Sequence, residues 1–225
     1  MTALDVRGNT NLRYLMANNL GISSIDLSNN ANLVVVRLNY NSELFGDLDF
    51  SHLPQLEQLW IRATDITSVN VSGLTELEVL SLSQNENMHT VNTSGAMALR
   101  FVEIHLSADS LISGQITSFD ASGLENLEVF RAAHQQLTTL VFHPNAPLRT
   151  VSVRNNNLQE LDVSMMVTTF VTNHLIARGN DLQNLIIPST LSGGAANFTA
   201  QQNNLGDTTW AGIWYGNPNM VVTQP

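Results

Sequence analysis

The sequence predicts a repeat solenoid, a coil in which short strands from successive units stack into a parallel β-sheet. An apolar phrase of the form L-x-x-L-x-L-x-x-N, most regular in residues 77–85, recurs along nearly the whole chain. The period is nearly constant, because Ile66 and Met88 occupy equivalent positions 22 residues apart, and Leu137 and Leu158 occupy equivalent positions 21 residues apart. A single unit of this length cannot bury its apolar side chains alone, so each unit must be stabilised by its neighbours.

Each unit is expected to contribute one short strand from the L-x-L centre of its phrase, with alternate residues pointing inward. Asparagine at the ninth position is expected to turn the chain and to satisfy backbone groups of neighbouring turns. That position holds Asn41, Asn85, Asn156, Asn180 and Asn203, with Thr64, Ser107 and Gln135 as polar substitutes and Leu20 as a departure. In chain order, the units are centred on residues 12–20, 33–41, 56–64, 77–85, 99–107, 127–135, 148–156, 175–180 and 198–203.

A second phrase alternates with the first and is shorter. It begins as Leu4-Asp5-Val6 and recurs at residues 25–28, 48–51, 69–72, 91–94, 119–122 and 161–164. Its alternation of apolar and polar residues is extended rather than helical. We therefore expect short strands or irregular turns on the outer side of the coil, with few or no α-helices. The Asp, Asn and Ser columns of this phrase should hydrogen-bond the backbone of adjacent turns.

Together these phrases resemble the leucine-rich repeats of bacterial proteins, which have about 21 to 23 residues in each unit. The LDVS sequence at residues 161–164 is typical of them, and the resemblance spans roughly residues 2 to 205. Such repeats occur in internalin-like and Bacteroidetes-like surface and secreted proteins. The resemblance implies a leucine-rich-repeat solenoid with its parallel β-sheet on the concave side, through which the chain binds other molecules. We accordingly expect an extracellular, cell-surface or virion-surface location.

The repeats occupy residues 1–205, which we expect to form a solenoid of about nine units. Residues 206–225 depart from the pattern, and Trp210, Ile213 and Trp214 could cover the open end of the core, so this segment is expected to be a C-terminal cap and tail. Within the repeats, ELFGD at residues 43–47 adds about one residue to its unit. No basic and apolar leader precedes the first unit. We therefore expect a chain that has lost its leader, or a piece of a longer one.

Composition excludes several classes of protein. The chain has no Cys, so disulfides, thiolate metal sites and cysteine nucleophiles are impossible. Its formal charge of -10 makes nucleic acid a poor general partner. No apolar run approaches the ~18 residues that would suggest a membrane span. A nucleophile turn of the G-x-S-x-G type is missing, and repeats leave little room for a buried pocket, so we expect neither enzymatic activity nor a cofactor.

Arginine is concentrated on the predicted strands. All nine basic residues are Arg, and five of them flank the inward-pointing L-x-L pairs. Of the nineteen acidic residues, only Glu103 lies at such a position. The predicted concave face is thus positive on an acidic chain, and Arg suits bidentate pairing with carboxylate, sulfate or phosphate. Aromatic side chains at the same positions are of the kind enriched in binding hot spots. The candidate binding residues are Arg37, Tyr40, Trp60, Arg62, Phe101, Glu103, His105, Arg131, His134, Arg154 and Arg178.

A merely solubilising role for these arginines is the alternative. Arg154 and Arg178 share a column in consecutive units, so they should lie ~5 Å apart. Two positive charges at this spacing repel each other, and a chain that keeps them there favours a functional role. The histidines at 105 and 134 fall on neighbouring units, but a metal site needs three or four ligands in a defined geometry, so no metal site is expected. The unit at residues 66–85 presents only uncharged residues on the predicted concave face and should serve the fold alone.

Three functions remain open. The first is a non-enzymatic module that recognises a protein partner through the concave face. The second is a binder of acidic glycan or another anionic surface polymer, as a receptor-binding part of a bacterial or virion surface protein. The third is a structural spacer within a larger chain or oligomer.

Overall fold

In the computed structural model the described residues are 3–107, 113–167, 174–188, 197–200 and 203. The expected cap and tail at residues 206–225 lie outside them. Within the described segments the chain is a coil of parallel strands without any helix. The prediction of a repeat solenoid with few or no helices is therefore confirmed.

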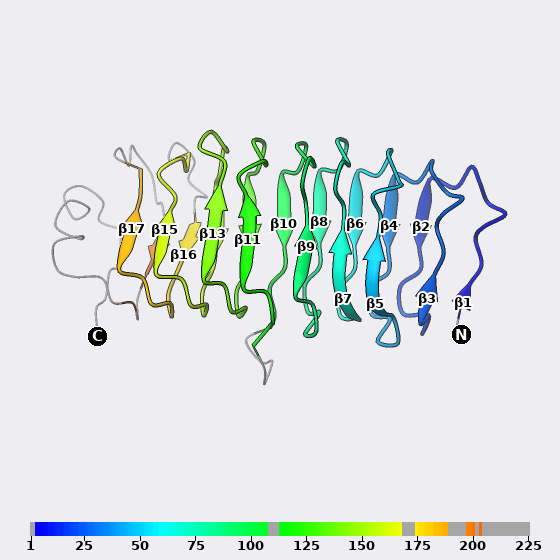
Figure 1. The fold of residues 1–225 in the computed structure, drawn as a ribbon, viewed down its shortest axis with the longest axis horizontal. Helices are drawn as coiled ribbons and strands as arrows, with labels where there is room; N and C mark the ends of the chain where they lie inside the picture. The colour runs from blue at the N-terminus through cyan, green and yellow to red at the C-terminus, as the bar shows by residue number, and fades with distance from the viewer. Residues whose placement is uncertain (1–2, 108–112, 168–173, 189–196, 201–202, 204–225) are drawn as a thin grey trace.

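One side of the coil is a single nine-stranded parallel sheet (Figure 1). Each turn contributes one strand of three residues, and consecutive turns pair without interruption from the first turn to the last. The strands start at the residue before the first leucine of the L-x-L centre, one position earlier than the sequence suggests. They are β2 (Tyr14–Met16), β4 (Val35–Arg37), β6 (Gln58–Trp60), β8 (Val79–Ser81), β10 (Phe101–Glu103), β12 (Val129–Arg131), β14 (Thr150–Ser152), β16 (His174–Ile176) and β18 (Asn197–Thr199).

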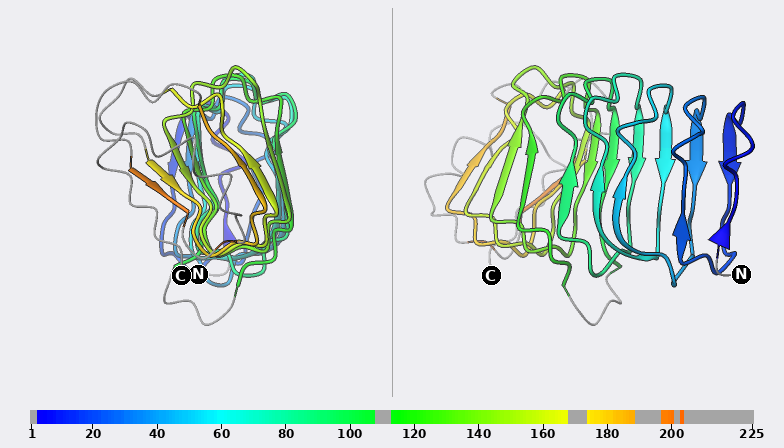
Figure 2. Two further views of the ribbon diagram at one scale, coloured as in Figure 1. Left: turned by 90° about the vertical axis from the view of Figure 1, so that its left-hand side faces the viewer. Right: turned by 45° about the vertical axis from the view of Figure 1, so that its right-hand side comes forward.

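The second side also carries parallel strands, as the alternating phrase predicts, but they form four separate sheets. The first sheet pairs β1 (Ala3–Leu4) with β3 (Ser24–Ile25), and the second joins β5 (Phe45–Asp49), β7 (Asp65–Asn70) and β9 (Thr90–Asn92). The third pairs β11 (Ser118–Ala121) with β13 (Thr139–Phe142), and the fourth pairs β15 (Glu160–Asp162) with β17 (Asn184–Ile186). Figure 2 shows the two strand layers facing each other across a narrow interior.

Where neighbouring sheets of the second side meet, they leave a seam without strand pairing. A cleft of about 290 Å³ lies at the β3/β5 seam, one of about 640 Å³ at the β9/β11 seam and one of about 380 Å³ at the β13/β15 seam. The extra residue predicted in ELFGD does not form a bulge within β5. The register between β5 and β7 shifts at Gly46 and Asp47, and the residue left without a partner is Thr67 of β7. The nine-stranded sheet stays continuous opposite every seam.

The core between the two layers consists of the inward residues of both phrases. Leu80 and Leu82 are fully buried, as are their equivalents in the neighbouring turns. In the later turns three aromatic rings replace aliphatic side chains. The Phe130 ring centroid lies 5.0 Å from that of Phe119 and 5.3 Å from that of Phe142, the latter in an edge-to-face geometry. Burial of this continuous apolar row supplies most of the stability of the coil.

A ladder of side-chain amides joins six of the turns to the preceding one, as predicted for asparagine at this position. It consists of Asn41, Asn85, Asn156, Asn180 and Asn203, with Gln135 in the same role. Asn85 is typical: its Nδ2 donates to the carbonyls of Ile61 and Leu82 at 2.8 Å each, while its Oδ1 accepts from the Thr64 N–H at 2.9 Å. These are backbone groups that the turn would otherwise bury without partners.

The Asp and Asn column of the second side behaves differently from the prediction. We expected bonds to the backbone of adjacent turns, but these side chains mainly close turns within their own unit. The Asp49 Oδ1 accepts from the Ser51 N–H at 2.9 Å. Asp5 and Asp162, near the two ends of the column, accept in the same way from the N–H two residues ahead. A carboxylate or amide oxygen reaches the N–H two residues ahead with little strain, which favours this local turn. Contact between turns is side chain to side chain, as from Asn70 Nδ2 to Asp49 at 3.0 Å.

Candidate binding surface

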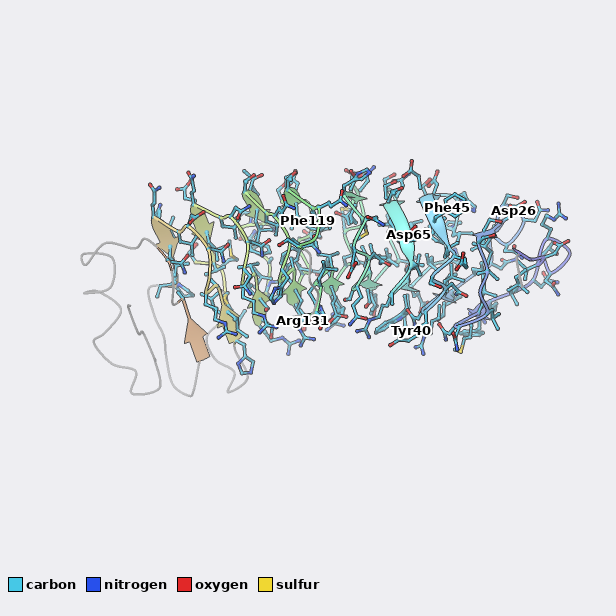
Figure 3. The ribbon with its side chains drawn as sticks, turned by 90° about the horizontal axis from the view of Figure 1, so that it is seen from below. Asp26, Tyr40, Phe45, Asp65, Phe119 and Arg131 are labelled. Carbon is cyan, nitrogen blue, oxygen red and sulfur yellow. The ribbon has the colours of Figure 1, made fainter. Side chains whose placement is uncertain are left out.

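The candidate binding residues lie on the outer surface of the nine-stranded sheet and on the turn that follows each strand, here called the strand face. Figure 3 shows Tyr40 and Arg131 on this side of the coil and Asp26 and Asp65 on the opposite side. Arg37, Trp60, Ser81, Glu103 and Arg131 form one row of directly paired strand residues. A second row, two residues after each strand, contains Arg62, Ser83, His105, Arg154 and Arg178.

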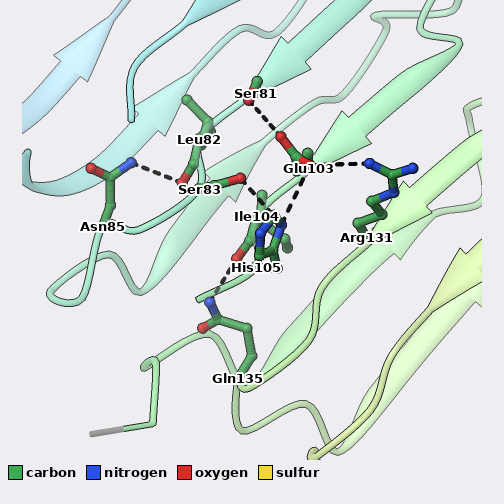
Figure 4. A network of polar contacts seen from close by, with 9 residues as sticks. All are labelled: Ser81, Leu82, Ser83, Asn85, Glu103, Ile104, His105, Arg131 and Gln135. Carbon is green, nitrogen blue, oxygen red and sulfur yellow. Dashed lines mark hydrogen bonds and ion pairs between the residues drawn. The ribbon is translucent and has the colours of Figure 1, made fainter. Parts of the chain in front are cut away.

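Glu103 lies at the centre of the strand face and is almost fully buried, with 6% of its surface exposed. Its Oε2 accepts a hydrogen bond from Ser81 Oγ at 2.9 Å, and its Oε1 lies 3.5 Å from His105 Nδ1 and 3.4 Å from an Arg131 amino group (Figure 4). Ser83 Oγ lies 3.3 Å from the same His105 nitrogen. The carboxylate is therefore the shared acceptor of a small polar network.

The network keeps Glu103 ionised. Burial raises the pKa of the Glu103 carboxyl. The hydrogen bond from Ser81 and the charges of His105 and Arg62 together lower that pKa by more than burial raises it, so it lies below its ordinary value. Burial lowers the pKa of His105; nearby Glu103 opposes this shift, and the surrounding arginines add to it. Burial and the charge of Arg154 likewise lower the pKa of His134. Both imidazoles are thus held in the neutral form at neutral pH.

These shifts predict a stability that falls on mild acidification. A histidine whose folded pKa is depressed contributes stability that is present above its unfolded pKa of about 6.5 and is lost as the pH falls below it. We expect thermal unfolding followed by circular dichroism to give a lower Tm at about pH 5.5 than at about pH 7.5. In a His105→Gln, His134→Gln double variant this difference should shrink. An unchanged difference would show that other groups cause it. The lowered pKa of Glu103 affects stability only at a lower pH, below the ordinary carboxyl pKa of 4.5.

An aromatic and cationic stack runs along the same face. The Arg37 guanidinium lies 5.4 Å from the Trp60 ring centroid, Trp60 stacks on Phe101 at 6.5 Å, and Arg131 lies 5.7 Å from the Phe101 ring. Trp60 and Phe101 belong to β6 and β10, so they meet across the intervening strand β8. They can do so because β8 presents small Ser81 between them. Such stacks hold long arginine side chains in place over an aromatic surface.

Most arginines of the strand face differ in their partners from Arg7, Arg100 and Arg149. Arg7 pairs with Asp5 at 2.9 Å, and Arg100 and Arg149 both pair with Glu128, all away from the strand face. On the strand face Arg131 shares Glu103 at 3.4 Å. Within the described segments no carboxylate pairs with Arg37, Arg62, Arg154 or Arg178. Three buried N–H donors, Arg37 Nε, Trp60 Nε1 and Arg62 Nε, also have no acceptor among the placed residues.

Tyr40 and His134 are displayed by an unusual backbone. Both occupy the third position after a strand, with φ of 61°, and Asn155 at the equivalent position has φ of 54°. Only glycine adopts this left-handed region freely, although asparagine tolerates it. Backbone hydrogen bonds hold the position: the Tyr40 N–H donates to Arg62 O at 2.8 Å, and the His134 N–H donates to Arg154 O at 2.9 Å. The strain is offset by these bonds between turns.

The N-terminal end of the strand face is apolar. Tyr14, Met16 and Tyr40 expose 57%, 61% and 56% of their surfaces, and Leu20 exposes 41%. Single exposed apolar residues are ordinary, but neighbouring ones form a patch of the kind that marks protein contacts. The strand face therefore passes from an apolar end to an aromatic and cationic centre, and then to the cationic end at Arg154 and Arg178.

The geometry does not assemble a nucleophilic relay from Ser83, His105 and Glu103. A relay needs the acid on one imidazole nitrogen and the hydroxyl on the other. Here both contact Nδ1, and Ser83 is fully buried. No cluster of three or more His, Asp or Glu side chains suited to a metal ion occurs in the segments whose side chains are placed. The chemistry that this surface supports is recognition by charge, hydrogen bonding and aromatic contact.

Ser81 and Ser83 are the residues that the sequence interpretation missed. We expected them to be exposed and unimportant, yet both are fully buried and hold Glu103 and His105. The unit at residues 66–85 therefore supports Glu103 and His105 from below, and the expectation that its outward serines are exposed is wrong. A signal existed in the sequence: the small residues stand one repeat after Trp60 and one repeat before Glu103.

Comparison with protein-family models, with curated proteins and with solved structures finds no match for this chain. What the chain does must therefore be inferred from its own side chains. Within the described residues, no helix is both long and apolar enough to cross a membrane.

Proposed function

We propose that this chain is a non-enzymatic binding module that recognises a protein partner through the strand face. The observation that carries the proposal is the set of unpaired cations, Arg37, Arg62, Arg154 and Arg178, on a chain with more than twice as many acidic as basic residues. Arginines without internal carboxylates are suited to pair with carboxylates brought by a partner. The candidate residues in contact are the eleven named from the sequence, to which Ser81 and Ser83 are added as supports.

The apolar end of the strand face favours a protein over a simple polyanion. Tyr14, Met16 and Tyr40 offer contacts that an acidic polymer would leave unused. Acidic glycan or another anionic surface polymer is the second candidate, and it is favoured by Arg154 and Arg178, which neighbour each other on consecutive turns. We further propose that the solenoid is of the leucine-rich-repeat type and that it acts at a bacterial cell surface, in the extracellular space or on a virion. The repeat phrases and the buried asparagine ladder support the repeat type.

A binding panel tests the proposal. The parent chain, immobilised, is exposed to purified extracellular proteins and to a glycan array, each at low and high salt. We expect salt-sensitive binding to a protein, and an affinity at least about tenfold lower for an Arg62→Gln, Arg154→Gln, Arg178→Gln triple variant. Arg7→Gln, in which a carboxylate-paired arginine outside the strand face is lost, is the matched control and should bind like the parent. Binding to acidic glycans alone would favour the second candidate. A triple variant that binds every ligand like the parent would exclude the strand face.

A further inference from the structure

The second side of the coil carries a column of outward polar residues, one for each turn, here called the acid column. Register places Asp49, Asn70 and Asn92 side by side, and Asp120 and Asp162 hold the same position in later sheets. Asp26 follows β3 at the equivalent place. All four aspartates at positions 26, 49, 120 and 162 are exposed. Their bonds to the serine N–H two residues ahead fix them without neutralising their charge.

The acid column and the strand face match turn by turn. Four turns carry an aspartate in the acid column and an arginine on the strand face: Asp26 with Arg37, Asp49 with Arg62, Asp120 with Arg131, and Asp162 with Arg178. The two turns formed by β7 with β8 and by β9 with β10 have asparagine in the acid column. On the strand face the same two turns carry serines and the Glu103 network, and no arginine.

Three turns depart from the pattern, and one of them is the turn of β17 and β18, where Ile186 stands in the acid column. The turn of β13 and β14 has Arg154 on the strand face but Val141 in the acid column. The turn of β1 and β2 has Asp5 in the acid column without a strand-face arginine, and there the carboxylate is already paired with Arg7 at 2.9 Å. A charge that is neutralised within the chain needs no external partner. The departure at Arg154 supplies an internal control for the experiment below.

We infer that the protein partner of the strand face is a second copy of this chain, docked through its acid column. The inference rests on the proposed function and names the partner. Both faces belong to the same coil, so the charges of both recur turn by turn along the axis, with steps of about 4.8 Å between paired strands. The acid column also crosses the three seams, where the strands are not paired. Two copies side by side, with axes parallel and turns in register, therefore place each of the four aspartates opposite an arginine.

The reversed alignment is less complete. In this alignment the axes are antiparallel, and the turns of β7 with β8 and of β9 with β10 in one copy face the same turns in the other. Asp162 then lies opposite the turn of Met16, and Arg37 lies opposite Val141, so neither has a partner of opposite charge. Parallel docking is therefore favoured. Because the strand face of one copy uses the acid column of the next, the contact is heterologous and leaves one free face of each kind at the ends. Such contacts generate open rows of molecules rather than closed dimers.

The net charge of -10 opposes association at long range. At about 0.1 M salt the Debye length is about 10 Å, which screens repulsion between whole chains more than it screens contacts between neighbouring charges. Self-association should therefore be present near this ionic strength. It should weaken at about 1 M salt, where the Debye length is about 3 Å.

Sedimentation velocity over a range of concentrations tests the inference. The parent should form concentration-dependent species larger than a dimer. An Asp26→Asn, Asp49→Asn, Asp120→Asn, Asp162→Asn variant should stay monomeric. Its fold should be retained, because asparagine at residues 70 and 92 makes the same turn bond to Ser72 and Ser94. Mixing this variant with an Arg37→Gln, Arg62→Gln, Arg131→Gln, Arg178→Gln variant should give dimers and nothing larger, because only one intact face of each kind remains.

Single variants test the register. Arg178→Gln should weaken self-association roughly two- to fivefold, as expected for one exposed ion pair, whereas Arg154→Gln, whose own turn has Val141 in the acid column, should weaken it less. Equal effects of the two variants would overturn the turn-by-turn register. A parent chain that sediments as a monomer at every concentration would overturn the inference, as would an aspartate variant that associates like the parent.

These failures are separable from failure of the proposed function. The aspartate variant keeps an intact strand face, so it can be tested on the binding panel. If it binds another protein there while the parent does not self-associate, the proposed function stands and the second copy is excluded as the partner. If the parent associates and the triple strand-face variant does so equally well, the strand face is not used and both proposals fall.

Discussion

Replacing Asn85 by alanine is expected to lower the free energy of unfolding by about 3–5 kcal/mol, because several buried groups each lose a partner at about 1–3 kcal/mol. Its amide donates to the carbonyls of Ile61 and Leu82, and its oxygen accepts from both the N–H and the hydroxyl of Thr64. Asn85 itself has 1% of its surface exposed, so water cannot replace these bonds without opening the turn.

Urea unfolding followed by circular dichroism measures the loss. The matched control is Asn29→Ala, which removes an exposed asparagine from a turn and should change stability by no more than about 0.5 kcal/mol. If the two variants unfold at the same urea concentration, the asparagine ladder is not what joins the turns. Asn85 lies in the middle of the coil, so its loss should weaken the contact between the two halves rather than fray an end.

Phe130→Ala is expected to cost about 3–5 kcal/mol, as large-to-small substitutions of buried aromatic residues do. Phe130 is fully buried and contacts the rings of Phe119 and Phe142, with centroids 5.0 and 5.3 Å away. Alanine would leave a cavity in the core and would remove both ring contacts. Phe130→Leu keeps most of the volume and should cost less than about 1.5 kcal/mol.

The same urea titration distinguishes burial from residue type. Phe45→Ala removes the same ring from the second side, where 65% of the residue is exposed. This control should change stability by about 0.5 kcal/mol or less. A loss at Phe130 no larger than that at Phe45 would contradict the placement of the Phe130 ring at the centre of the core.

The fold could be predicted because every unit repeats the same physical requirement. The apolar positions around Leu80 and Leu82 recur at a fixed period, and such a pattern has only one way to bury all its members. The role of Asn85 was also predictable, since a side-chain amide can donate two hydrogen bonds to backbone carbonyls and accept others with its oxygen. The seams on the second side were not, because the phrases that flank a seam read like those that pair.

The candidate surface was predictable in part. Alternation along a strand places Arg37, Trp60 and Arg131 outward, and the structure brings them into one row. The alternation pattern alone cannot show that a small outward residue is covered by large neighbours. Ser81 is buried where Trp60 and Phe101, 21 and 20 positions away in the chain, stack on each other across β8. Burial of this kind is decided between turns and is visible only when residues are compared across the repeat.

The seams give the coil unequal stiffness in different directions. Lengthening the strand-face side would break backbone hydrogen bonds of an uninterrupted sheet, whereas lengthening the second side needs only a further opening of three existing clefts. The easiest flexing motion therefore curves the coil toward the strand face, with the seams as hinges. The widest cleft, between β9 and β11, lies behind β10 and β12, which carry Glu103 and Arg131. Curvature would thus concentrate beneath the central polar network, and the elasticity of one side of the molecule would set how closely the other side can wrap what it binds.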